Sequence, residues 1–453
     1  MDEIFHVDQV KHYCAGNFTY WNSKISTPPG LYLISVAVVR PLQSRLDSPK
    51  DRAYLCSLHM LRFLNPFFLS LAFLVAVATL HFGKDSCNNP LTSLLSAVAV
   101  TLFPVYFFSS LLYYTDVLST LSVLMMYFLH QRNLTVFSGL TGVLACCMRQ
   151  TNIVWVLFCL GLTVEREAVA YLRHFYVQRG KDRPGENEES SSTAQNSNRW
   201  SDLGSFFCAV VAMCREKPRL FGRLVLSAFA KSTSYFMVIA AFAVFVAVNG
   251  GLALGDKGAH RAVPHFPQLY YWSGFTLFFG LPFFANLRFV QSQMCTLHRN
   301  WKLHLFSAMG LAVGVLYFTY VHPYLLADNR HYTFYIWKWW FRKHWAMKFV
   351  LIPGYLFALL AIARSLGHKS GLWRLGFAVA TVLVTVPNKL LEFRYFILPF
   401  LIWRLNLDQR LITAPRICCE ILLFSVINAV TVWLFLMRPF HWAHERGVQR
   451  FMW

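Results

Sequence analysis

The sequence lacks the short motifs that identify most soluble enzyme classes. It contains no Walker loop, no Rossmann glycine fingerprint, no HExxH pair and no GxSxG elbow. Soluble nucleotide-dependent enzymes, metalloproteases and serine hydrolases therefore have no local support. Its 11 cysteines form no CxxC pair and no zinc spacing, so the sequence predicts neither a metal site nor a cofactor.

Charged residues are scarce as well. They make up 14% of the 453 residues, whereas 56% are hydrophobic and 17% aromatic, a composition that does not describe soluble domains. Eight apolar blocks are about long enough to cross a membrane as helices: Leu61–Phe82, Leu91–Tyr113, Ser234–Leu254, Tyr270–Val290, Leu303–Pro323, Met347–Ala363, Leu372–Pro387 and Ile417–Met437. Shorter or interrupted blocks are Leu31–Leu42, Val117–His130, Val136–Val164 and Ile397–Leu405.

These blocks predict an all-α polytopic membrane protein with about 11–12 transmembrane helices, because a backbone in hydrocarbon must satisfy its hydrogen bonds within its own segment. Lys and Arg outnumber Asp and Glu by 42 to 21, and the net charge is +21. The basic residues cluster in alternate loops, which favours a cytoplasmic membrane face and lipid headgroups over nucleic acid. These clusters are Arg40–Arg62, Arg166–Lys231, Arg288–Lys302, Arg364–Arg374 and Arg404–Arg416.

The remaining loops are then expected on the lumenal side: Met1–Gly30, Gly83–Pro90, Gly255–Gln268 and Pro323–Ala346. The predicted organisation is a first lumenal loop with an acidic pair (1–30), an N-terminal transmembrane bundle (31–164), a cytoplasmic and partly disordered loop (165–231), and a C-terminal transmembrane bundle (232–453) with a lumenal loop (323–346). Within the cytoplasmic loop, Trp200–Cys214 is expected to form a short amphipathic helix on the membrane.

Two further features bear on this topology. The sequons at Asn17 and Asn133 both fall in segments expected to be lumenal. Cys14 and Cys87 are the only cysteines in such segments, so they are the one pair that the predicted topology offers for a lumenal disulfide.

A first constellation of functional residues opens the chain. Asp2 and Glu3 stand side by side, and His6, Gln9 and Tyr13 follow. In a helix, Asp2 would share one face with His6, Gln9 and Tyr13, and that face would point towards a cavity at the membrane surface. A solvated turn, with Asp2 near the positive end of a helix, fits the same spacing.

A second constellation runs from His322 to Trp345. It places cations on the side expected to be poor in them. A phosphate needs cationic groups and a polyprenyl tail needs apolar neighbours, so the segment suits a lipid phosphate. An aromatic belt with snorkelling basic residues explains the tryptophan-rich half, but it explains Ala327–Tyr335 less well. The residues concerned are Arg330, Lys338, Arg342, Lys343, Trp337, Trp339, Trp340 and Trp345.

A third constellation, Asn388–Pro399, places Glu392 and Arg394 in an otherwise apolar stretch. Ionisable residues at membrane depth are costly and usually face a cavity or each other, so these two are candidates for lining a site. A structural ion pair is the alternative. Arg149, inside a long apolar block, has the same status and fits a helix break equally well.

Five segments carry a resemblance to a known family: MDEIFH with YCAGNF, STPPGLYLIS, LLADNRHYTFY, EFRYFILP and QRFMW. The chain resembles the dolichyl-phosphate-glucose-dependent alpha-1,2-glucosyltransferases that add the last glucose to the lipid-linked oligosaccharide for protein N-glycosylation. The resemblance spans the chain apart from its low-complexity linker. It implies a GT-C type bundle in the endoplasmic reticulum membrane, with lumenal loops forming the active site.

The resemblance also implies the substrates: a dolichyl-phosphate-glucose donor and a dolichyl-diphosphate-linked oligosaccharide acceptor that already carries two glucoses. Inversion at the sugar needs one base, which we assign to Asp2 with Glu3 as second choice. Family members carry a helix before this acidic pair, and the predicted topology requires one there. The residues expected to contact substrate are His6, Asp328, Asn329, Arg330, His331, Tyr332, Glu392 and Arg394.

Two other classes of function fit the same composition. A non-catalytic multi-span scaffold or channel-associated protein would keep the fold without the chemistry. A transporter has less support, because the sequence shows no inverted internal repeat.

Overall fold

The computed structural model describes residues 3–45, 47–48, 50, 54–83, 89–182, 202–255, 261–443 and 445–453. The N-terminal half contains α1 (Glu3–Cys14), α2 (Gly30–Gln43), α4 (Leu58–Phe82), α5 (Pro90–Leu102), α6 (Pro104–Ser110), α7 (Asp116–Gln131), α8 (Thr135–Met148), η1 (Gln150–Asn152), α9 (Ile153–Asp182), α11 (Leu203–Glu216) and α12 (Pro218–Asn249).

The C-terminal half contains α13 (Pro267–Phe279), α14 (Leu281–Phe284), α15 (Leu287–Arg299), α16 (Trp301–Tyr317), α17 (Pro323–Ala327), α18 (Tyr332–Ile336), the π-helix η3 (Trp337–Phe341), α19 (Met347–Val350), α20 (Ile352–Ser365), α21 (Gly371–Thr385), η4 (Phe393–Phe396), α22 (Ile397–Leu405), α23 (Ala414–Met437) and the strands β1 (Phe440–Trp442) and β2 (Glu445–Gln449). The two strands form an antiparallel hairpin. The predicted all-α polytopic class is confirmed.

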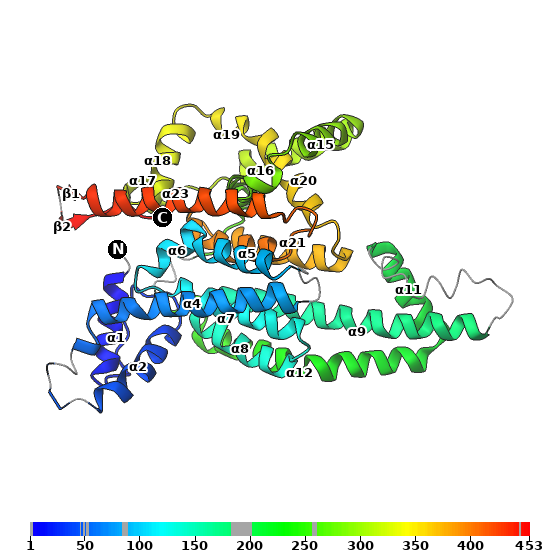
Figure 1. Ribbon diagram of the computed structural model, residues 1–453, viewed down its shortest axis with the longest axis horizontal. Helices are drawn as coiled ribbons and strands as arrows, with labels where there is room; N and C mark the ends of the chain where they lie inside the picture. The colour runs from blue at the N-terminus through cyan, green and yellow to red at the C-terminus, as the bar shows by residue number, and fades with distance from the viewer. Residues whose placement is uncertain are drawn as a thin grey trace.

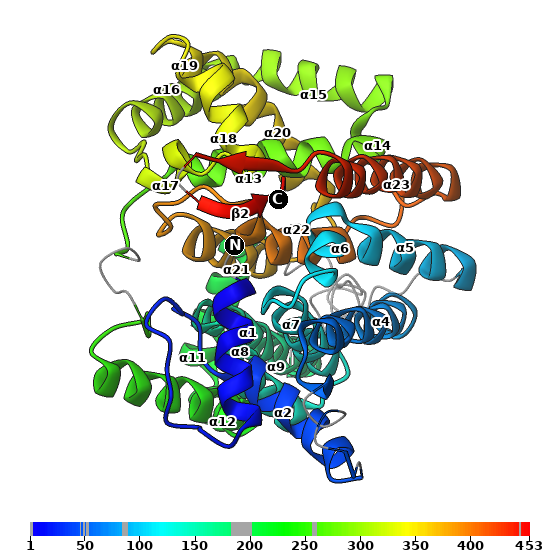
Figure 2. The ribbon, with the colours of Figure 1, turned by 90° about the vertical axis from the view of Figure 1, so that its left-hand side faces the viewer.

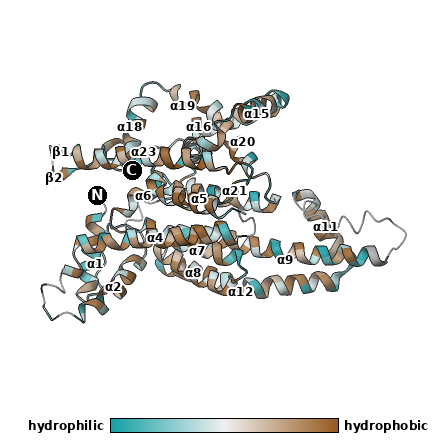
Figure 3. Cartoon of the chain, in the orientation of Figure 1, coloured by the Kyte–Doolittle hydropathy of each residue, from teal (hydrophilic) through white to brown (hydrophobic). Residues whose placement is uncertain are grey.

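Long helices run side by side along the longest axis of the molecule, among them α4, α5, α9, α12 and α23 (Figure 1). Apolar residues dominate the central stretches of α4, α5 and α23 (Figure 3). Helices α1 and α2, the hairpin, α17 and α18 gather at one end of this bundle, and the far parts of α9 and α12 project from the other end with α11 (Figures 1 and 2).

In the described residues, 4 helical segments are long and apolar enough to cross a membrane: 58–82, 218–249, 347–365 and 414–437. The bent pair α5 and α6 makes a fifth candidate, and α2, α8, α16 and α21 are shorter apolar helices. The count expected from the sequence is higher, because a window of apolar residues passes over backbone breaks that divide a block into shorter helices.

The break between α5 and α6 shows how the sequence directs these divisions. Pro104 has no N–H and disfavours a helical conformation in the residue before it. Phe103 accordingly adopts φ −52° and ψ 120°, and the two helices meet at 66°. The bend redirects α6 and the turn after it towards α1.

Contacts between distant segments define one end of the bundle, which we call the α1 end. The Tyr113 N–H donates to Glu3 (2.7 Å), and the Gln150 side chain donates to the Ser26 carbonyl (2.6 Å). The Leu254 N–H also donates to Ser26 (3.3 Å). Residues 3–26, 113–116, 149–150, 254–255, 263–265, 328–331, 387–394 and 449–453 therefore lie together at the α1 end.

Other contacts define the opposite end. Arg132 donates to the Phe82 carbonyl (3.2 Å), Arg166 donates to the His130 carbonyl (3.1 Å) and to Asn133, and Ser370 donates to Glu165. Four of the predicted basic clusters, those around 166–231, 288–302, 364–374 and 404–416, reach this end.

Three sequence-based placements are wrong in this arrangement. The cluster Arg40–Arg62 contributes to the α1 end, where Arg62 pairs with Glu3. Gly83 lies beside Gln131 at the opposite end, and Asn133 lies there too, far along the bundle from Asn17. The positive-inside rule assigns loops by the number of basic residues that they contain. It does not detect a basic residue that is paired with an acidic residue at the opposite membrane face.

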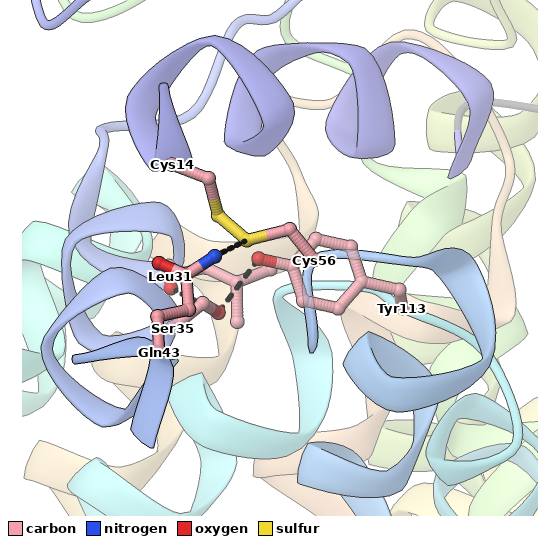
Figure 4. Close-up of a disulfide and its surroundings, with 6 residues drawn as sticks. All are labelled: Cys14, Leu31, Ser35, Gln43, Cys56 and Tyr113. Atoms are coloured by element: carbon pink, nitrogen blue, oxygen red, sulfur yellow. Dashed lines mark hydrogen bonds between the residues drawn. A yellow bond between two sulfur atoms is a disulfide. The ribbon is translucent and has the colours of Figure 1, made fainter. Parts of the chain in front are cut away.

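A disulfide joins the C-terminus of α1 to the segment before α4, between Cys14 and Cys56 (Figure 4). The Gln43 side chain at the end of α2 donates to the Cys56 sulfur (4.0 Å), and Ser35 of α2 hydrogen-bonds Tyr113 (2.7 Å). Cys87, the other cysteine in a segment expected to be lumenal, lies outside the described residues. The topology predicted from charge places 40–62 on the other side of the membrane from Cys14, so it does not predict the pairing with Cys56.

Cys14→Ser and Cys56→Ser are each expected to lower the free energy of unfolding by about 2–4 kcal/mol, because the bond closes a loop with a sequence separation of 42. Thermal unfolding of the purified protein in detergent measures the loss. Cys208→Ser, at an exposed free cysteine, is the control. Unfolding midpoints equal to that of the control would contradict the prediction.

The segment predicted to be a cytoplasmic loop is largely helical where it is described. Helix α9 continues to Asp182, and α12 begins at Pro218. The amphipathic helix expected over Trp200–Cys214 is present as α11, but Phe206, Ala209 and Met213 are buried, in a cluster with residues of α9 and α12. The apolar face of α11 therefore packs against protein, and its expected position on the membrane stays a prediction. The low-complexity centre, 183–201, lies outside the described residues.

Candidate active site

A pocket at the α1 end gathers residues from five distant parts of the chain. It lies where α1, the bend after α5, the segment before α18, η4 and the C-terminal segment meet. Its lining residues are Glu3, Val105, Phe108, Ser109, Leu112, Tyr114, Asp116, Arg330, His331, Glu392, Arg394, Met452 and Trp453. Five residues singled out from the sequence are therefore brought together: Glu3, Arg330, His331, Glu392 and Arg394.

Glu3 is held on both carboxylate oxygens. Arg62 of α4 donates from Nε to Oε1 (2.8 Å) and from Nη2 to Oε2 (2.5 Å), and the Tyr113 N–H also donates to Oε1 (2.7 Å). The Glu3 side chain is only 6% exposed. Its lone pairs are largely occupied, so Glu3 is better suited to fix the start of α1 than to accept a proton from a substrate.

Asp2, the first choice for the base, lies outside the described residues. It is covalently adjacent to Glu3, whose position is set by Arg62 and Tyr113. The sequence-based assignment of Asp2 therefore stays a prediction.

Helix α4 positions the turn after α6. Asn65 donates to the carbonyls of Leu112 and Tyr114 (3.1 Å for the latter), and Asn65 is fully buried. A buried amide that satisfies two loop carbonyls removes the cost of burying them unpaired. This contact fixes the loop from which Tyr114 and Asp116 enter the pocket.

Asp116 is a pocket residue that the sequence reasoning missed. It lies in the first turn of α7, and Arg149 binds its Oδ1 through Nη2 (3.1 Å). The sequence marks Arg149 as unusual, but it does not identify Asp116 as its partner. A carboxylate at the boundary of a long apolar block, next to a threonine that can precede a helix, was the available signal.

The cationic side of the pocket comes from the segment before α18. Arg330 donates to Asp328 from Nε (2.8 Å) and Nη2 (2.6 Å) and to Gln449 (3.3 Å), and its guanidinium lies 4.7 Å from the Trp442 ring centroid. Burial acts to raise the pKa of Asp328, but hydrogen bonds and charge from Arg330 and His331 outweigh it and leave this pKa below its usual value. Asp328 thus remains an anion that orients Arg330.

The C-terminal segment completes this side. The Met452 N–H donates to the Arg330 carbonyl (2.9 Å), and the Tyr332 N–H donates to the Met452 carbonyl (3.3 Å). His331 hydrogen-bonds the Trp453 carbonyl through Nδ1 (3.0 Å). The similarity in QRFMW pointed to this segment, but its pairing with 330–332 could not be read from the sequence.

Asn329 and Tyr332 stand behind the lining. The Asn329 side chain accepts a hydrogen bond from the Trp442 indole (2.6 Å), and the Tyr332 ring packs edge-on against Trp453. Burial raises the pKa of Tyr332 to about 12. Both residues were expected to contact substrate, but they lie behind the pocket lining and support it.

Glu392 and Arg394 connect the two sides. Arg394 donates to Glu392 through Nε and to the Tyr114 hydroxyl through Nη1, and its guanidinium lies over the Tyr114 ring (5.3 Å). The alternatives considered for this pair, a structural ion pair and a cavity lining, both hold here, because the pair faces the pocket.

His6 is placed behind the pocket. It is buried, hydrogen-bonds the Tyr32 hydroxyl of α2 and meets Tyr114 edge-on. Gln9, on the same face of α1, binds the backbone of Tyr20 and Asn22. The polar face predicted for α1 therefore exists, but in its described part it packs against neighbouring segments.

The pocket lining thus combines the carboxylates Glu3, Asp116 and Glu392 with Arg330, His331 and Arg394. Such a mixture suits a substrate that carries both hydroxyl groups and a phosphate. Within the described ranges, no group of three or more His, Cys, Asp or Glu side chains is arranged to hold a metal ion.

Comparison with known proteins agrees with this chemistry. Residues 1–405 match the DIE2/ALG10 family. A Mus musculus protein named Dol-P-Glc:Glc(2)Man(9)GlcNAc(2)-PP-Dol alpha-1,2-glucosyltransferase is 38% identical over 464 residues, covering 100% of this chain and 93% of the relative. Proteins of the same name from Homo sapiens and Arabidopsis thaliana are each 34% identical, covering 100% of this chain and 93% and 94% of the relative. No solved structure matches the chain.

Proposed function

This chain belongs to the DIE2/ALG10 family, and from that premise we propose how its pocket carries out the reaction. The protein is a membrane-bound alpha-1,2-glucosyltransferase that depends on dolichyl-phosphate-glucose. Its acceptor is the dolichyl-diphosphate-linked oligosaccharide that already carries two glucoses. The names of the relatives support this reading and not the alternatives, a silent scaffold and a transporter.

The proposed reaction is a single displacement with inversion. The acceptor hydroxyl attacks the anomeric carbon of the donor glucose, the carbon–oxygen bond to the phosphate breaks, and dolichyl phosphate leaves. Asp2 takes the hydroxyl proton during the attack. A phosphate leaves as a stable anion, so no general acid is needed on that side.

Arg330, His331 and Arg394 bind the donor phosphate and stabilise the charge that develops on it. One observation carries the proposal. These three residues line a single pocket with Glu3, the neighbour of Asp2, although each of them is more than 300 positions from Glu3 in the sequence. Val105, Phe108 and Leu112 on the same lining provide apolar contacts for the first isoprene units of the donor.

Glucose transfer by the purified, liposome-reconstituted protein tests the function. Labelled dolichyl-phosphate-glucose is supplied with acceptors that carry one, two or three glucoses. We expect the label to enter only the diglucosylated acceptor, with an alpha-1,2 linkage. A chain that transfers label to none of the three acceptors would be a scaffold and would overturn the proposal.

We place the α1 end on the lumenal side of the endoplasmic reticulum membrane. Asn17 is exposed at this end and Asn133 is exposed at the opposite end, so only Asn17 is expected to carry a glycan. The measurement is the shift in gel mobility on endoglycosidase treatment, in the unvaried chain and in Asn17→Gln and Asn133→Gln. A shift that disappears only in Asn133→Gln would place the α1 end in the cytosol.

A further inference from the structure

We propose that Asp116, oriented by Arg149, accepts hydrogen bonds from hydroxyl groups of a glucose residue in the pocket. The inference rests on the proposed function and adds a substrate-binding residue to it. The glucose belongs either to the donor or to the end of the acceptor glycan, because both present the same ring hydroxyls.

Asp116 keeps unused capacity to accept hydrogen bonds. Its side chain is 5% exposed, and the ion pair from Arg149 to Oδ1 is its one contact with a donor in the described part of the chain. Glu3, in the same lining, receives three hydrogen bonds. A buried carboxylate normally receives several donors, so Asp116 lacks partners that a substrate can provide.

Arg149 acts on Asp116 from outside the pocket lining. It is not one of the lining residues, and its Nε is buried without a hydrogen-bond partner in the described structure. Asp116 therefore meets a ligand as an acceptor. A sugar hydroxyl can donate to its carboxylate, whereas a phosphate oxygen only accepts, so Asp116 matches a sugar better than a phosphate.

The charge around Asp116 also favours a sugar. Asp116 shares its side of the pocket with Glu3, whereas the cations Arg330 and Arg394 come from the other segments. A phosphate at Asp116 would meet a second anion, while a neutral hydroxyl gains a charge-assisted hydrogen bond.

Three elements hold the pair in place. Arg149 stands at the break between α8 and η1, with extended φ −146° and ψ 130°. Asn152 donates from its side chain to Ser119 of α7 (2.8 Å) and to the Ala145 carbonyl of α8 (2.8 Å). This cross-link fixes the first turn of α7 against the break, so the pair is oriented before substrate arrives.

Asp116→Asn tests the inference by steady-state kinetics with each substrate varied in turn. The amide keeps the size of the side chain but loses the charge. We expect the KM of one substrate to rise about 10- to 100-fold. A rise for the donor assigns Asp116 to the donor glucose, and a rise for the acceptor assigns it to the acceptor glucose. Asp116→Glu, which keeps the charge, is expected to recover part of the affinity.

Glu167→Gln is the matched control. Glu167 is also buried (7% exposed) and pairs with one cation, Lys231 (2.7 Å), but it lies at the opposite end. Thermal unfolding of both variants separates a loss of stability from a loss of binding. KM values for both substrates equal to those of Glu167→Gln would overturn the inference, as would a fall in kcat alone. If the unvaried protein transferred no glucose, the proposed function itself would fail.

Discussion

Asp2→Asn is expected to reduce glucose transfer by about 10²–10⁴-fold, the usual contribution of a positioned general base. An amide cannot take the proton from the acceptor hydroxyl, so the attack on the anomeric carbon would release a proton with no acceptor. The measurement is kcat in the reconstituted transfer assay. Binding of both substrates should change little, because the base acts mainly in the transition state.

Asp8→Asn is the matched control for this prediction. Asp8 lies on the same helix α1, where it accepts hydrogen bonds from Tyr20 (2.9 Å) and Asn22 (3.4 Å), and it does not line the pocket. Its replacement is expected to leave kcat within about twofold. Full transfer by the double variant Asp2→Asn, Glu3→Gln would remove the acidic pair from the mechanism.

Arg394→Gln is expected to lower kcat/KM for dolichyl-phosphate-glucose by about 10²–10³-fold, comparable with the loss of one donor from an anion-stabilising site. The neutral side chain can no longer stabilise the leaving phosphate, and Glu392 loses its cationic partner. The measurement is kcat/KM with the donor varied at saturating acceptor.

Two further variants separate these effects. Arg410→Gln is the control. Like Arg394, Arg410 follows an acidic residue by two positions, but it is 85% exposed and lies at the opposite end. Its replacement should leave activity unchanged. The double variant Glu392→Gln, Arg394→Gln removes the unpaired carboxylate. If the double variant regained full activity, the repulsion from Glu392 would explain the loss, and Arg394 would not bind the phosphate.

Much of the candidate site could be predicted from local sequence because its residues are unusual where they stand. Glu392 and Arg394 interrupt an apolar block, and Arg330 lies in a loop on the side where basic residues are rare. Both signals depend on the cost of placing charge near a membrane. The structure brings these residues into one pocket with Glu3.

The partners of these residues could not be predicted. Arg62 was counted as one positive charge in a cytoplasmic cluster, yet it neutralises Glu3 at the α1 end. Asp116 and Arg149 are 33 positions apart in the sequence but form one ion pair. Each pairing depends on how helices pack, and a charge count does not contain that information.

The sequence by itself determined the class of protein, because apolar blocks of this length must form helices that satisfy their own backbone in a membrane. It also determined which side chains are available for a lipid-phosphate sugar. Only the tertiary structure decided where those side chains meet. The break at Pro104 turns α6 towards α1, the break at Arg149 ends α8 where Arg149 meets Asp116, and the segment 449–453 pairs with 330–332. Such contacts between distant segments arise from packing and long-range hydrogen bonds, which no local spacing records.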